Sequence, residues 1–100
     1  MIKKLKLLYK TCKTVRTELK NCRSSDIASQ LDCIYYSCSI LHKIICRFNI
    51  SSDLSYRFDN FIENGYGLIS STALSEKIDS IIIFYNEVIK FLIIARNKLN

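Results

Sequence analysis

The sequence predicts an all-α protein that folds as an antiparallel four-helix bundle. The 100 residues include no proline and only two glycines, so little in the chain would interrupt a helix. Apolar residues make up 49% of the chain, enough for the core of one domain spanning residues 1–100. These residues recur at steps of three and four in four segments with short connections, as expected for amphipathic helices packed into a bundle.

The first segment, residues 2–22, predicts an amphipathic helix with a cationic outer face. Residues 1–23 hold eight basic residues and one acidic residue, whereas the remainder holds seven basic and eight acidic residues. The positive charge of the chain therefore belongs to this segment. A solvated lysine face is one interpretation; the other is a face for an anionic partner or membrane, formed by Lys3, Lys6, Lys10, Lys13 and Arg16. The inward stripe comprises Ile2, Leu5, Leu8, Tyr9, Cys12, Val15, Leu19 and Cys22.

The second segment, residues 26–48, is the clearest two-faced helix in the sequence. Ser24 or Ser25 is suited to cap its first turn, and Asp26 suits the positive end of the helix dipole. His42 lies beside the apolar stripe, so we expect a partly buried structural histidine. The stripe itself comprises Ile27, Leu31, Ile34, Cys38, Leu41, Ile45 and Phe48.

The third segment is short, running from about residue 53 to residue 63. A turn at residues 49–53 offers its cap, and residues 64–67 end it because glycine readily takes positive φ values. Its inward residues are Leu54, Phe58, Phe61 and Ile62. Ser70, Ser71 and Thr72 are candidate caps for the next helix.

The fourth segment, residues 74–99, is apolar nearly all round, so it needs neighbours on several sides. A β-strand at residues 81–85 is disfavoured because the helical stripe continues through it in register. Glu87 and Lys90 interrupt the apolar run, which argues against a membrane span. In an up-down bundle this helix lies beside the first and third helices, which would cover two of its sides. Its main stripe comprises Leu74, Ile78, Ile81, Tyr85, Val88, Leu92, Ala95 and Leu99.

A second strip on this helix, formed by Phe84, Phe91 and Ile94, has two interpretations. It packs against the first and third helices, or it is an exposed patch for a partner or a homodimer. We expect the partner-binding residues to be this strip and the basic end beside it: Phe84, Lys90, Phe91, Ile94, Arg96 and Lys98.

Residues that would support catalysis or a cofactor are not apparent. The sequence offers no nucleophile–base pair, no phosphate-binding glycine loop and no metal-ligand spacing, so we expect neither an enzyme nor a metal or cofactor site. The five cysteines are odd in number and lack a C-x-x-C pair, which disfavours a disulfide framework. Cys12, Cys22 and Cys38 lie on the apolar stripes, so we expect most of the thiols to be buried, in a reducing cytosol. Nucleic-acid binding is disfavoured because the basic segment lacks interleaved aromatic residues.

Residues 50–62, which read ISSDLSYRFDNFI, are followed by GYGLISS at residues 65–71 and then by the long fourth segment. This order resembles the second half of immunity proteins for pediocin-like (class IIa) bacteriocins. Arg57 and Phe58 would fill the position where that family carries an arginine beside a large apolar residue. The number of cysteines and the end of the chain directly after the fourth helix depart from the family pattern.

The resemblance implies a cytoplasmic, non-catalytic protein that protects a bacteriocin producer. Such a protein would act from the cytosolic side on the mannose phosphotransferase permease, with the cationic first helix near the inner leaflet. Lys90, Phe91, Ile94, Arg96 and Lys98 would recognise that receptor complex. The alternative is a small all-helical viral or phage protein that binds a host protein or self-associates, which the chain's richness in isoleucine, lysine, asparagine and serine also fits.

Overall fold

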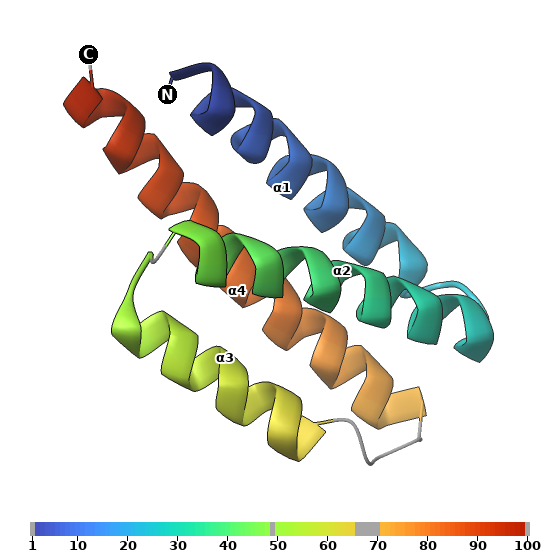
Figure 1. The fold of residues 1–100 in the computed structure, drawn as a ribbon. Coiled ribbons are helices and arrows are strands. Elements are labelled where there is room, and N and C mark those ends of the chain that lie inside the picture. Colours follow the sequence, from blue (N-terminus) through green and yellow to red (C-terminus); the bar gives the residue numbers. More distant parts are fainter. Residues whose placement is uncertain (1, 49, 66–70, 100) are drawn as a thin grey trace.

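The described part of the chain consists of four α-helices. In the computed structural model it comprises residues 2–48, 50–65 and 71–99, and no strand occurs within those ranges. The helices are α1 (Ile2–Cys22), α2 (Ile27–Phe48), α3 (Ser52–Gly65) and α4 (Ser71–Leu99) (Figure 1). The predicted all-α, four-helix fold is confirmed, and residues 81–85 continue the helix α4 rather than forming a strand.

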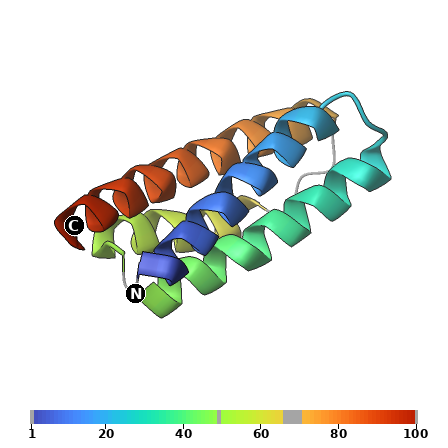
Figure 2. The same ribbon diagram turned by 90° about the horizontal axis from the view of Figure 1, so that it is seen from above.

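Consecutive helices run in opposite directions along an elongated bundle of 45 × 25 × 16 Å (Figure 2). The last helix, α4, contacts each of the other three, and its contact with α1 is the most extensive in the bundle. Helix α3 lies on the side of α4 away from α1, and α2 crosses α4 between them (Figure 1). The expected position of α4 beside α1 and α3 is therefore confirmed, and α2 covers a third side.

The core is formed by the inward stripes that the periodicity predicts. Helix α4 contributes most to it, because Ile78, Ile81, Tyr85 and Val88 are completely buried. The other helices add Cys12 and Leu19 from α1, Leu41 from α2 and Phe58 from α3, also with no exposed area. Burying one such aliphatic or aromatic side chain contributes about 1.5–3 kcal/mol, so the packing of α4 against three neighbours dominates the stability of the bundle.

Among the described side chains, two cap helix starts. Asp26 Oδ1 accepts a 2.7 Å hydrogen bond from the backbone N–H of Ser29, and Ser51 Oγ accepts a 3.3 Å bond from that of Leu54. Asp26 is thus the cap of α2, which corrects the prediction of Ser24 or Ser25. Ser24 instead donates a hydrogen bond to the Asn21 carbonyl at the end of α1. The predicted caps at residues 70–72 concern side chains outside the described part of the structure.

Three of the cysteines are core residues as predicted: Cys12, Cys22 and Cys38. Cys33 is half-buried and Cys46 is exposed. His42 is also exposed, which corrects the prediction of a partly buried histidine; its Nε2 lies 3.6 Å from Cys46 Sγ, one helical turn along α2.

Candidate partner-binding groove

A groove of about 300 Å³ separates the first turns of α3 from the C-terminal half of α4. The turn after α2 places Ile50 and Ser51 at its mouth, and the Ser51 cap fixes where α3 begins. Leu54 and Arg57 then face α4, because they are one helical turn apart on the same side of α3. We call this site the α3/α4 groove; it is lined by Ile50, Ser51, Leu54, Arg57, Glu87, Lys90, Phe91 and Ile94.

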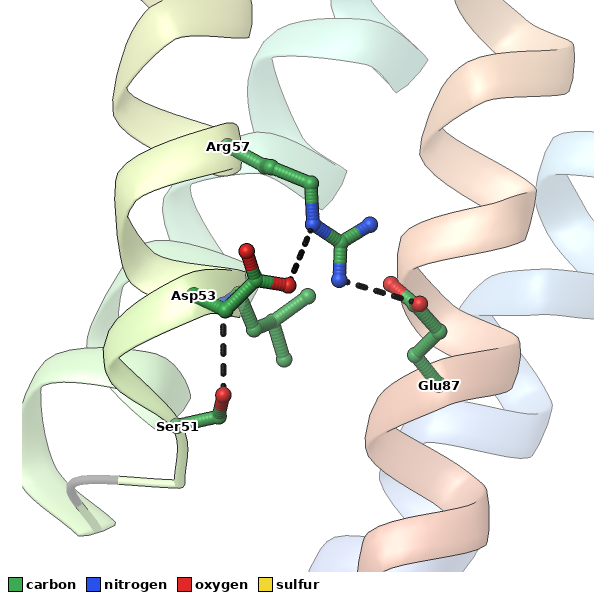
Figure 3. A network of polar contacts seen from close by, with 5 residues as sticks. Ser51, Asp53, Arg57 and Glu87 are labelled. Atoms are coloured by element: carbon green, nitrogen blue, oxygen red, sulfur yellow. Dashed lines mark hydrogen bonds and ion pairs between the residues drawn. The ribbon is translucent and has the colours of Figure 1, made fainter.

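Arg57 joins the two walls of the α3/α4 groove. Its Nε donates to Asp53 Oδ2 at 2.9 Å within α3, and its Nη2 donates to Glu87 Oε1 at 3.1 Å across to α4 (Figure 3). The bond to Glu87, with a further contribution from Asp53, raises the pKa of Arg57, so the guanidinium stays charged. Arg57 and Glu87 thereby link α3 to α4 at this point.

Glu87 has one carboxylate oxygen that the bond to Arg57 does not satisfy. Its Oε2 is buried and has no hydrogen-bond partner among the described residues, although the side chain as a whole is 40% exposed. A buried acceptor without a donor is costly, and a donor brought by a bound partner would relieve that cost. Sequence reasoning did not select Glu87; its position opposite Arg57 depends on the packing of α3 against α4.

Three of the predicted partner-binding residues line the α3/α4 groove: Lys90, Phe91 and Ile94. Lys90 and Ile94 are exposed, and Phe91 is half-buried against the core. The groove therefore offers an apolar floor with charged groups at its edges, which is the arrangement that an amphipathic segment of a partner would fit.

Phe84 does not belong to this surface. It is only 8% exposed and packs between α4 and α3, with its ring centroid 5.4 Å from that of Phe58 at an interplanar angle of 79°. Phe61 lies 5.7 Å away on the same side. The prediction that Phe84 contributes to a partner-binding strip is therefore corrected: this phenylalanine holds α3 on the bundle.

The two predicted basic residues at the end of α4 lie apart from the α3/α4 groove. Arg96 lines a smaller cavity of about 110 Å³ between α1 and α4, opposite Lys6 and beside Ile93. Lys98 is exposed in the last turn of α4. The predicted set is thus divided between the core, the groove and the α1–α4 boundary.

The cationic face of α1 is largely as predicted. Lys3, Lys6, Lys10 and Lys13 are exposed, and the Lys13 ammonium lies 5.2 Å from the centroid of the Tyr9 ring. Arg16 differs, because it is half-buried and donates a 2.8 Å hydrogen bond to Asn86 Oδ1 on α4. Four of the five predicted cations are therefore available to a partner, and the fifth ties α1 to α4.

Comparisons with protein-family models, with curated proteins and with solved structures return no match to this chain. Among the described residues, none of the helices combines the length and apolarity needed to cross a bilayer. The same residues contain no group of three or more histidine, cysteine or acidic side chains placed to hold a metal ion.

Proposed function

We propose that this protein is a non-catalytic binding protein that protects a cell against a pediocin-like bacteriocin. It would act from the cytosolic side on the membrane receptor complex, the mannose phosphotransferase permease. The observation that carries the proposal is the α3/α4 groove: Lys90, Phe91 and Ile94 line it together with Arg57, the residue at which the sequence resembles the immunity family.

The side chains of the groove have separate roles in this proposal. Leu54, Phe91 and Ile94 would receive an apolar side chain of the receptor; burying one residue of leucine size contributes about 1.5–3 kcal/mol. Lys90 would pair with an acidic group at the edge of the contact, which affects specificity and association rate more than affinity. The ion pair of Arg57 with Glu87 would hold the two walls together.

Expression of the chain in a bacteriocin-sensitive strain tests the proposal. The parent chain should allow growth in the presence of at least one class IIa bacteriocin, and Ile94→Ser and Lys90→Glu should each reduce that protection. Ile83→Ser is the matched control, because Ile83 is exposed on α4 and does not line the groove. Immunoblots should show equal amounts of all four chains.

Failure to protect against every class IIa bacteriocin would overturn the proposal. Equal loss of protection in Ile83→Ser and Ile94→Ser would show that the groove is not the binding site, although the protein would still confer immunity.

The viral or phage alternative is favoured by one observation on the opposite side of the molecule. Leu7 and Tyr36, 65% and 57% exposed, line a second groove of about 280 Å³ between α1 and α2, beside Val15. Exposed aromatic and aliphatic side chains around a groove are typical of self-association or of docking to a host protein. A dimer in solution that Tyr36→Ser converts to a monomer would favour this alternative.

A further inference from the structure

The charges of this protein are separated along the long axis of the bundle. Because the helices alternate in direction, the start of α1, the end of α2, the start of α3 and the end of α4 all lie towards the same end of the bundle (Figure 2). We call it the terminal end; it comprises residues 3–13, 38–57 and 86–98. Eleven basic residues lie there against two acidic residues, whereas the rest of the chain holds four basic and seven acidic residues.

The cations of the terminal end are accessible and little neutralised. All eleven are exposed, and both acidic residues, Asp53 and Glu87, are engaged by one of them, Arg57. The other ten come from three separate stretches of sequence: Lys3, Lys4, Lys6, Lys10, Lys13, Lys43, Arg47, Lys90, Arg96 and Lys98. The positive surface is therefore larger than the first helix alone and is created by the topology.

Exposed aliphatic side chains lie among these cations. Leu7 is 65% exposed between Lys3 and Lys10 on α1, and Ile93 is 43% exposed near Arg96 on α4. Isolated exposed aliphatics are common, but here two of them share one end with ten cations. Aliphatic side chains gain from the acyl boundary of a bilayer, whereas lysines reach the headgroups with their ammonium groups.

We propose that the terminal end docks on the surface of an anionic lipid bilayer. Charge complementarity selects an anionic partner, and Leu7 and Ile93 select lipid over nucleic acid, because a phosphate backbone offers nothing to an exposed aliphatic side chain. This deepens the proposed function by naming the surface that holds the protein at the membrane. The vesicle experiment contains neither bacteriocin nor permease, so either proposal can fail alone.

Sedimentation with vesicles tests the docking. The full chain should bind vesicles of equal parts phosphatidylglycerol and phosphatidylcholine, should not bind phosphatidylcholine alone, and should be released as salt is raised from 0.1 to 0.5 M. Removing two lysines near the surface with K6Q/K10Q should weaken binding about 30-fold. R96Q/K98Q should weaken it to a similar extent, because docking uses the whole end.

Two matched controls test whether vesicle binding depends on the terminal end or on the total charge and apolar surface of the protein. K20Q/K77Q changes the net charge equally but at the opposite half of the bundle, so binding should fall less than about threefold, because salt screens those charges from the surface. Ile93→Ser should weaken binding severalfold. Ile83→Ser, the same substitution at an exposed position of α4 outside the terminal end, should not.

Equal losses in K6Q/K10Q and K20Q/K77Q would overturn the inference, since binding would then follow total charge. Unchanged binding by R96Q/K98Q would also overturn it, because α1 alone would carry the contact. Tighter binding to duplex DNA than to anionic vesicles at the same salt would show that the terminal end is a nucleic-acid surface instead. Circular dichroism of each variant should match that of the parent chain.

Discussion

The phenol of Tyr85 donates a 2.6 Å hydrogen bond to the backbone carbonyl of Ser37, in the middle of the core. Tyr85 is completely buried, so its hydroxyl group would be costly without this acceptor. The bond joins the midpoint of α4 to the midpoint of α2, the two helices that cross in the bundle.

Tyr85→Phe should lower the free energy of unfolding by about 1 kcal/mol, the typical net contribution of one buried hydrogen bond. Urea denaturation, monitored by circular dichroism, measures this difference in the free energy of unfolding. Tyr36→Phe is the control: Tyr36 is 57% exposed, and a surface change should stay within about 0.5 kcal/mol. Equal midpoints for the parent chain and Tyr85→Phe would show that the hydroxyl contributes nothing to stability.

Cys12 should make the stability of the protein sensitive to alkaline pH. Burial raises the pKa of this thiol from 9.0 to about 11, and the nearby Arg16 only partly opposes the shift. The unfolded chain therefore loses this proton first as the pH rises. The stability that the protonated thiol contributes is complete below pH 9 and is lost progressively as the pH rises towards 11, with a slope of up to about 1.4 kcal/mol per pH unit.

Urea midpoints measured between pH 8 and 11 should therefore fall less steeply for Cys12→Ala than for the parent chain. The alanine also leaves a small cavity, which lowers stability at every pH and so does not alter the slope. Identical slopes in the two chains would contradict the assignment to Cys12.

Asp26 should make the start of α2 sensitive to acid. The backbone N–H of Ser29 lowers the pKa of Asp26 below 3.8, so the folded state holds this carboxylate ionised at lower pH than the unfolded state does. Its contribution to stability is present above pH 3.8 and is lost as the pH falls through the lowered pKa. Asp26→Ala should therefore be less stable than the parent chain at pH 7, and the difference should shrink below pH 3.8.

Asp26→Asn is the matched variant, because asparagine caps a helix well but does not titrate. It should keep most of the stability at pH 7 and should lack the acid-dependent loss. A stability difference between Asp26→Ala and the parent chain that is the same at pH 7 and pH 3 would rule out the carboxylate as its cause.

Phe84 should be a stability residue rather than a binding residue. Phe84→Ala removes a ring that packs edge-on against Phe58, and the cavity left behind should lower the free energy of unfolding by about 3 kcal/mol. Ile83→Ala, one residue away but 58% exposed, should change it by less than about 0.5 kcal/mol. Denaturant titration of both variants measures the contrast. A Phe84→Ala variant as stable as Ile83→Ala would mean that Phe84 is not held in the core.

The sequence was sufficient to predict the helices because each carries a stripe at steps of three and four. The bounds of α1 are those predicted, and α2 begins one residue later than expected. The predicted cap of α2 was wrong because Ser24, Ser25 and Asp26 are all good caps, and only the exact start of the helix decides among them.

The candidate site was only partly predictable. A helical wheel puts Phe84 beside Phe91 and Ile94, but it does not say how far α3 extends along α4. Helix α3 has 14 residues and covers Phe84 while leaving Ile94 exposed. The role of Glu87 and the terminal end were missed for a related reason. Both depend on segments that are distant in sequence lying close together in the fold, which a local sequence pattern does not predict.

The extensive contact between α1 and α4 has a consequence for folding during synthesis. The apolar stripe of α1 has its main partner in α4, which is made after α2 and α3. Contacts of such large sequence separation form slowly, and the surfaces that await them are prone to aggregate. A nascent chain that lacks α4 should therefore depend on chaperones, and its lysine-rich first helix should help to keep it in solution until the bundle closes.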